Sequence, residues 1–398
     1  MQKQRHFFCL LLLTLIMPCL TMAQKKELSQ ARSYIKSSNF DKAEKEMTGL
    51  LKKDSASRDN KRVYLLWFEA VRGQYNQANE RMYLKQQQDT AAFFDLCRRM
   101  FTILEKVDSL EMRPDKKGRV VLENREKHAE LLNTYRPNLF GAGSFHLRKG
   151  QYKQAFEYFE NYIECARQPL FSAYGYDSTD VRMPEAGYWA TYSAYKQQDA
   201  VLTLRYHQLA LRDSSKAQFT LQYVAEARRW LNDEELYIKT LEEGFSRYPT
   251  SAYFFPRLFD AYTQQSQLEK ALALSDSALN VNDSSELFLF AKSTTLLRLE
   301  RYEQCVEVSD RLIALNDSLA EAYFNAGTAW LRIAEKMNPR KDKKPLRTVY
   351  EKARNYMERY RQLAPDEKQK WAPALYVIYL NLNMGRQFDE IDRLLKKQ

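Results

Sequence analysis

The residues that could do chemistry in this 398-residue sequence are few and far apart. A zinc site or a nucleophile–base pair needs histidine, cysteine or carboxylate side chains at defined spacings. Beyond residue 23 the sequence holds three histidines, His128, His146 and His207, and no HExxH or CxxC pattern. Gly141-Ala142-Gly143 is a lone GxG with no strand pattern before it, so it predicts no phosphate-binding loop. The sequence therefore predicts no enzymatic activity, no cofactor and no metal site.

What the sequence does contain is an internal repeat between residues 252 and 365. Apolar and small residues recur at a step of 34 residues, as in Leu268 and Tyr302 or Ala271 and Cys305. The joint Asn282-Asp283-Ser284 recurs at the same step as Asn316-Asp317-Ser318. A constant period of this length predicts a solenoid in which each repeat is one pair of helices.

These units resemble the tetratricopeptide repeat (TPR) family. Its pattern asks for an aromatic residue, a Leu-Gly pair, Tyr, Ala, a large apolar residue and a closing Pro. The unit beginning at Ala320 supplies Tyr323, Ala326-Gly327, Trp330, Ala353, Met357 and Pro365. Other units depart from it: Lys292-Ser293 replaces the Leu-Gly pair, and Ser275 and Ser309 replace the large apolar residue. The resemblance implies an all-α, right-handed superhelical solenoid of antiparallel helix pairs.

The first 23 residues have the pattern of a signal peptide. Lys3 and Arg5 precede an apolar run from Phe7 to Leu20, and Thr21-Met22-Ala23 offers a small-residue cleavage site. The run is short for a membrane span. Pro18 is a poor neighbour for lipidation of Cys19. We expect an exported chain with no transmembrane helix after cleavage, in the periplasm, with lipid-anchored and extracellular locations as alternatives.

Two further regions follow the predicted signal peptide. Residues 24–135 suggest N-terminal TPR-like and irregular helix pairs, with no readable register over 58–135. Residues 136–398 suggest a TPR solenoid with insertions at about 168–183 and 335–348 and a capping helix pair at the C-terminus. The second insertion carries Arg340-Lys341-Asp342-Lys343-Lys344, which is either a solvated basic loop or a docking point for acidic groups.

The repeat register gives several residues a plain packing role. Cys305 stands where neighbouring units have alanine, and His146 stands where they have Tyr262 and Trp330, so both are expected in the core. The two remaining cysteines beyond residue 23 are Cys97 and Cys165. An odd number of cysteines without CxxC spacing is no disulfide framework, although an oxidising compartment would permit one bond.

The charge of the chain limits its partners. The formal net charge is +11, and removal of Lys3 and Arg5 with the signal peptide would leave +9. A positive chain favours acidic partners, anionic envelope surfaces or simple solubility. Nucleic acid is not expected, because the basic residues are spread along the helices and the chain is predicted to be exported.

A predicted interaction surface lies along the first helix of each unit, which lines the concave face in TPR-like solenoids. Its candidate residues are Phe140, Phe290 and Phe324, and, two turns further along each helix, Arg148, Arg298 and Arg332. Rows of Phe and Arg suit an extended or helical peptide that carries acidic groups. The alternative is that the Phe side chains pack between units and the Arg side chains are solvated. Lys and Asn of the carboxylate-clamp type are missing, so capture of an EEVD-like C-terminus is not implied.

The sequence thus predicts an exported, non-enzymatic scaffold for protein–protein interaction in the cell envelope, acting through a concave groove. The alternative is a glycan- or nutrient-binding helical protein of SusD-like type. An exposed patch that brings Tyr174, Tyr176 and Trp189 together would favour that alternative, because stacked aromatic rings are what would bind a sugar.

Overall fold

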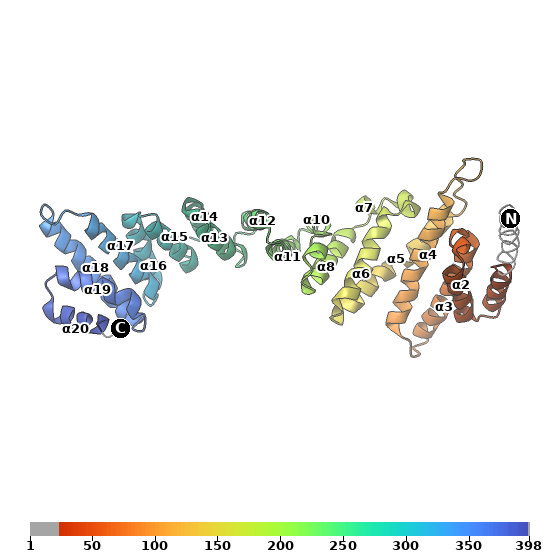
Figure 1. Cartoon of the computed structure of the whole chain (residues 1–398), viewed down its shortest axis with the longest axis horizontal. Coiled ribbons are helices and arrows are strands. Elements are labelled where there is room, and N and C mark those ends of the chain that lie inside the picture. Colours follow the sequence, from red (N-terminus) through yellow and green to blue (C-terminus); the bar gives the residue numbers. More distant parts are fainter. Residues whose placement is uncertain (1–23, 397–398) are drawn as a thin grey trace, which may run out of the picture. The chain divides into compact units, whose positions relative to one another are not determined.

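The computed structural model describes residues 24–396, and all regular elements in that range are helices (Figure 1). The predicted signal peptide, Cys19 included, lies outside the described residues. The chain divides into two compact units, residues 1–232 and 233–398. The division falls between α11 (Ala217–Trp230) and α12 (Glu234–Arg247). In the described part of the chain, no helix combines the length and apolar character needed to cross a bilayer.

The first unit is a series of helix pairs. After a helix over residues 24–36, its elements are α2 (Phe40–Lys53), η1 (Ser55–Asp59), α3 (Lys61–Tyr83), α4 (Thr90–Glu111), α5 (Arg125–Arg148), α6 (Tyr152–Glu164), η2 (Cys165–Arg167), η3 (Pro169–Tyr174), α7 (Tyr176–Thr179), α8 (Met183–Lys196), α9 (Ala200–Thr203), α10 (His207–Ala210) and α11 (Ala217–Trp230). Each long helix packs against its neighbours in the sequence, so that α6 lies between α5 and α8. This is the arrangement expected of a solenoid.

The second unit repeats the arrangement more regularly. Its elements are α12 (Glu234–Arg247), α13 (Phe254–Gln264), α14 (Leu268–Val281), α15 (Glu286–Arg298), α16 (Tyr302–Leu315), α17 (Ala320–Lys336), α18 (Lys343–Leu363), α19 (Lys368–Asn381) and α20 (Gly385–Leu395). Successive helices pack antiparallel, and α17 and α18 form the most extensive pair. The fold is therefore a TPR-like, all-α array of helix pairs, as the sequence predicts.

The same tight turn joins the two helices of most pairs. In each case the second residue after the first helix has a left-handed backbone, and the next helix begins two residues later. The residues are Ser38 (φ 58°), Gly150 (68°), Gln198 (58°), Ser266 (58°), Glu300 (58°) and Asn383 (57°). Asn232 (56°), the last residue of the first unit, has the same left-handed backbone. A left-handed backbone costs a non-glycine residue about 1–2 kcal/mol, so helix packing must hold these turns.

In the structure, the 34-residue period extends over a longer stretch of the chain than the sequence indicates. Gln198, Asn232, Ser266 and Glu300 follow one another at this step, and so do the ends of α8, α11, α13 and α15. The repeat therefore begins at α8. It was harder to see there because the second helix of that pair is broken into α9 and α10.

The break in that second helix has a packing cause. Tyr206 lies between α9 and α10, is almost fully buried, and donates its hydroxyl to Glu164 Oε1 on α6 at 2.6 Å. Gly187 on α8 faces α10, where an added Cβ would lie 2.9 Å from the backbone nitrogen of Ala210. The close approach of α8 and α10 thus needs a glycine at position 187.

The joints between successive pairs in the second unit are also repeated. Asn282 and Asn316 end α14 and α16 with the same backbone angles, φ −146° and ψ 97°. The side-chain oxygen of Asn316 accepts hydrogen bonds from the backbone nitrogen and the hydroxyl of Ser318, at 3.1 and 2.6 Å. An Asn side chain that bonds the backbone two residues on closes a turn without glycine. This explains why the Asn-Asp-Ser joint recurs.

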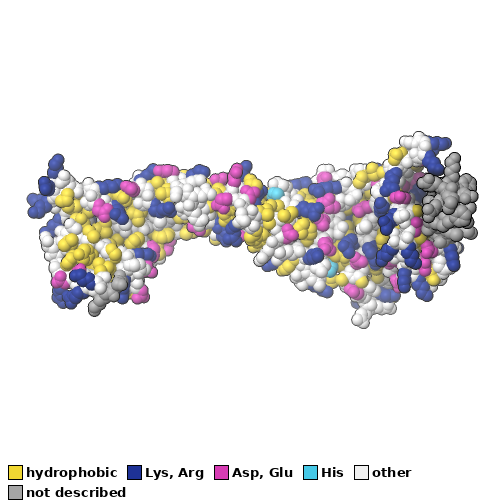
Figure 2. All heavy atoms as spheres, viewed as in Figure 1, with side chains coloured by type: hydrophobic (Ala, Val, Ile, Leu, Met, Phe, Trp, Pro, Cys, Tyr) yellow, Lys and Arg dark blue, Asp and Glu magenta, His cyan; other side chains and the backbone are white. Residues whose placement is uncertain are grey.

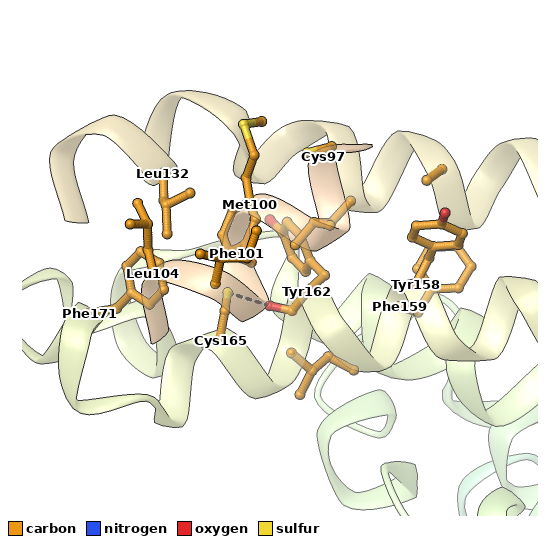
Figure 3. Close-up of a cluster of buried hydrophobic side chains, with 14 of the residues drawn as sticks. Cys97, Met100, Phe101, Leu104, Leu132, Tyr158, Phe159, Tyr162, Cys165 and Phe171 are labelled. Atoms are coloured by element: carbon orange, nitrogen blue, oxygen red, sulfur yellow. Dashed lines mark hydrogen bonds between the residues drawn. The ribbon is translucent and has the colours of Figure 1, made fainter. Parts of the chain in front are cut away.

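The core of the first unit forms where α4, α5, α6 and η3 meet (Figure 3). Its largest fully buried side chains include Met100 and Leu104 of α4, Leu132 of α5, Phe159 of α6 and Phe171 of η3. Burial of each such side chain contributes about 1.5–3 kcal/mol. Because Phe171 belongs to residues 168–183, this segment takes part in the core and is not a free loop.

Candidate interaction surface

The first helices of the second unit form one surface. α15 touches α17 and α17 touches α19, whereas the second helices α14, α16 and α18 contact one another less. Asn325 of α17 ties two first helices together, because its side-chain amide donates to the hydroxyls of Ser293 and Thr294 on α15, at 2.9 and 3.1 Å. Since the first helices lie closer together than the second ones, they occupy the inner side of this unit.

The predicted Phe positions of this unit are half-buried. Phe290 packs against the hydrophobic cluster formed by α14, α15 and α16. Phe324 lies with its ring centroid 5.1 Å from that of Tyr360 on α18, and the Lys370 ammonium lies 5.8 Å from its ring. Both rings therefore contribute to packing between helices and still present one side to solvent. Their role in binding stays a prediction.

The predicted Arg positions of this unit are exposed and weakly held. Arg298 donates to the carbonyl oxygen of Thr263 at 3.4 Å, and no carboxylate in the described range forms an ion pair with it. Arg332 pairs with Glu335 at 2.7 Å, and both side chains are about half exposed. An exposed pair of this kind contributes at most about 1 kcal/mol. Both guanidinium groups are therefore available to an acidic partner at little cost.

Phe140 and Arg148 belong to the first unit. The Phe140 ring makes edge contacts with the rings of Phe159 and Tyr162, at centroid distances of 5.4 and 5.5 Å, and is partly buried. Arg148 ends α5 and is exposed. The two residues occupy the same places before the turn at Gly150 as Phe290 and Arg298 do before the turn at Glu300. Their role also stays a prediction.

The sequence reasoning missed several exposed apolar side chains on the same surface. Leu297 and Leu331 lie one residue before the predicted arginines and are partly exposed. On α19, Val377 and Leu380 are 40% and 53% exposed. Figure 2 shows hydrophobic side chains gathered on the visible face over α17, α18 and α19. We call Phe290, Leu297, Phe324, Leu331, Val377 and Leu380 the apolar strip. Leu297 and Leu331 could have been predicted from sequence, because each directly precedes one of the predicted arginines.

A second missed feature is a ladder of aromatic rings on the first unit. It comprises Tyr152, Tyr188, Trp189, Tyr192, Tyr195, Tyr223 and Trp230. Tyr195 is stacked between Tyr223 and Trp230, at centroid distances of 4.5 and 5.6 Å. Tyr188 and Lys196 stand at the same distances before their turn as Phe140 and Arg148. They were missed because no repeat register was assigned to α8.

Residues 168–183 are tied down by a buried arginine. Arg136 of α5 is 5% exposed, and its guanidinium lies between the rings of Tyr162 and Tyr176, 3.8 Å from each centroid. It forms an ion pair with Asp180 and donates to Cys165 Sγ at 3.0 Å. Cation–π contacts and a desolvated ion pair of this kind need every partner in place.

This cluster also bears on the glycan hypothesis. Tyr176 is 6% exposed and lies within the Arg136 cluster, while Tyr174 is partly exposed beside it and Trp189 belongs to the aromatic ladder. The exposed patch of Tyr174, Tyr176 and Trp189 that would favour the glycan hypothesis is absent from the described residues. Nothing in the structure favours that alternative.

The thiols and His146 have packing roles. Cys97, Cys165 and Cys305 are buried free thiols, and burial raises the pKa of Cys97 to about 12 and that of Cys305 to about 11. His146 is buried, stacks on Tyr158 at 5.2 Å and bonds to Gln151 at 2.7 Å. The predictions of core positions for Cys305 and His146 are confirmed. Within residues 24–396, no group of three or more His, Cys, Asp or Glu side chains is placed to hold a metal ion.

Comparisons with known proteins add little to this picture. No family model matches the sequence, and no curated protein matches it. Among solved structures, the C-terminal part of a TPR repeat-containing protein from Cytophaga hutchinsonii has 11% identity and a TM-score of 0.42, covering 63% of this chain and 92% of that one. A structure of MamA protein has 13% identity, a TM-score of 0.35 and coverages of 48% and 96%. PilF of Pseudomonas aeruginosa has 14% identity and a TM-score of 0.33, and the match covers 61% of this chain and 95% of that one. Similarities with TM-scores this low support no argument. The assignment of a TPR-like fold rests on the helix pairs of the chain itself and on turns that recur every 34 residues.

Proposed function

We propose that the chain is an exported, non-enzymatic scaffold of the cell envelope that binds a protein or peptide partner carrying acidic groups. The binding site is the apolar strip of the second unit together with Arg298 and Arg332. One observation carries the proposal: the same triplet of Phe, Leu and Arg recurs at a step of 34 residues on α15 and α17, which touch each other. A partner would therefore meet an apolar row beside a cationic one.

The physical basis is preorganisation. The strip lies on helices fixed by their own packing, so binding requires little ordering of the scaffold. Apolar anchors supply affinity, and exposed arginines supply orientation and a faster encounter with an acidic partner. Among residues 24–396, Arg298 has no carboxylate partner to give up, which makes it the stronger of the two candidates.

The binding proposal is tested by affinity capture from the native envelope. The variant Arg298→Glu with Arg332→Glu reverses the cationic row. The matched control Lys52→Glu with Lys53→Glu makes the same charge change at two exposed positions at the end of α2. We expect one partner, identified by mass spectrometry, to be retained by wild type and the control and lost by the reversed variant. Equal capture by all three chains would contradict the proposal.

Export is tested separately by fractionation. The pattern of residues 1–23 supports it, with a chain beginning near Gln24 expected in the envelope fraction. A chain that keeps Met1 and stays in the cytoplasm would contradict export without touching the binding proposal.

A further inference from the structure

The first unit contains a ligand-sized cavity that the scaffold function does not use. Its volume is about 680 Å³, and it lies between the first turns of α5 and the 3-10 helix η3. Cavities of about 300–1,000 Å³ are the usual size of binding sites. Its floor is apolar, because Ala129 and Leu170 line it and both are almost fully buried.

The uncompensated charge of this cavity is negative. Glu126 and Glu130 line it, are exposed, and form no ion pair with any side chain in the described range. Arg125 also lines it, but its guanidinium is held by the buried Asp108 carboxylate through two bonds of 2.7 and 2.9 Å. A bidentate pair of this geometry cancels the arginine charge locally. Two free carboxylates remain in a chain whose overall charge is positive.

One wall of the cavity is a fixed aromatic ring. Tyr174 stacks on Tyr176 with a centroid distance of 5.3 Å, and Tyr176 is itself held by Arg136. The pKa of the Tyr174 hydroxyl is raised by burial and then by the Glu130 and Glu126 carboxylates, so both charges act at this wall. A ring face beside two carboxylates favours a cation with an apolar stem.

The rim adds an apolar contribution. Leu122 lines the cavity and is 38% exposed, and Val120 and Val121 before it are each 52% exposed. Three consecutive exposed apolar residues form an apolar patch beside the negative cavity, and such patches mark surfaces that a partner covers. A side chain that placed a methylene stem or an apolar neighbour here would remove them from water.

We propose that this cavity binds a short basic segment of a partner polypeptide, in which a lysine or arginine stands next to apolar residues. The cation lies between Tyr174, Glu126 and Glu130, and the apolar neighbours cover Leu122 and Leu170. The volume holds more than one side chain, which is why the occupant is a segment and not a single small amine. This site lies on a different unit from the apolar strip and selects the opposite charge, so its failure would leave the proposed scaffold function standing.

The test is calorimetric titration of the full chain with the blocked peptide Gly-Lys-Leu-Lys-Leu-Gly. Comparison peptides carry Glu or norleucine in place of each Lys. The test variant is Glu126→Gln with Glu130→Gln. The matched control is Glu69→Gln with Glu80→Gln, which changes the same charge at exposed, unpaired positions of α3.

We expect only the Lys peptide to bind. Its affinity should fall about tenfold in the test variant, because two charge contacts are lost, and stay unchanged in the control. The two variants have the same net charge, so a difference between them reports the cavity alone. Tyr174→Leu should weaken binding about threefold. Thermal unfolding of each variant shows whether it folds. The proposal is overturned if the Lys peptide binds test and control variants equally, if the norleucine peptide binds as well, or if wild type binds none of the three peptides.

Discussion

Replacement of Arg136 by Met should loosen residues 168–183 and destabilise the first unit. Methionine keeps much of the length of the side chain but loses the ion pair with Asp180 and the contacts with two tyrosine rings. Removing one partner of a buried ion pair costs about 3–5 kcal/mol, because the other charge stays buried without compensation. Asp180 keeps the Tyr162 hydroxyl at 2.6 Å and the Arg182 amide at 2.9 Å. We therefore expect the lower end, about 3 kcal/mol.

A second substitution separates the lost charge pair from the lost packing. Adding Asp180→Asn to Arg136→Met removes the uncompensated carboxylate, so about 1–2 kcal/mol of the loss should be recovered. The matched control is Arg167→Met, which removes an exposed arginine paired with Glu164 and should cost under about 1 kcal/mol.

The stability loss should also depend on pH. Burial pushes the pKa of Asp180 upward, but the Tyr162 hydroxyl and Arg136 together hold it below its usual value of 3.8. A carboxyl with a lowered pKa stabilises the fold above pH 4, and this contribution disappears as the pH falls through the folded-state pKa. The difference between wild type and Arg136→Met should therefore shrink below pH 4.

The assay is hydrogen exchange at pH 7, followed peptide by peptide, together with urea unfolding of the first unit. Amides of residues 168–183 should exchange faster in Arg136→Met and near the wild-type rate in Arg167→Met. If Arg136→Met leaves these amides unchanged and costs under about 1 kcal/mol, the inference that the ion pair holds this segment is wrong.

Three further predictions concern stability. Burial raises the pKa of Glu105 to about 7, so ionisation of this side chain destabilises the fold as the pH rises from about 4.5 to 7. Glu105→Gln should therefore raise the unfolding free energy at pH 8 by about 1–3 kcal/mol and leave it unchanged at pH 4.5. An equal effect at both pH values would contradict this. Gly143→Ala should lower the unfolding free energy by about 1–3 kcal/mol, because the added Cβ would lie 2.8 Å from the buried Phe159 ring on α6. Gly49→Ala should stabilise α2, because open space surrounds that position. If urea unfolding showed the two effects reversed, the packing argument would be refuted. Asn325→Ala should cost about 1–3 kcal/mol by leaving Ser293 without its partner on α17, and faster amide exchange in α15 would report it; unchanged exchange would show that the bond is not needed.

The helix pairs of the second unit could be predicted from sequence because their packing is repeated in the residue types. A position that must be small or apolar in one pair must be so in the next, which is why Ala271 and Cys305 are both fully buried. The joints were visible for the same reason, since Asn282 and Asn316 close the same turn.

Other features could not be predicted, because they depend on contacts between distant residues. Arg136 meets Asp180 only after two helices have packed, and nothing in the local pattern marks either residue as buried. The turns at Gln198 and Glu300 are left-handed without glycine, so a search for glycine or proline passes over them. With the turn at Gln198 unrecognised, Tyr188 and Lys196 could not be aligned with the other candidate residues.

The central claim is that a partner binds along the first helices of the second unit, and site-specific photo-crosslinking tests it most directly. A photoreactive phenylalanine replaces Leu297 or Leu331 on the apolar strip, and Val281 or Leu315 as matched controls. The control residues are about half exposed, are also separated by one repeat, and end the second helices α14 and α16. In the native envelope we expect the same partner to be crosslinked from Leu297 and Leu331 and not from Val281 and Leu315. Crosslinks from the controls alone would place binding on the second helices and contradict the account.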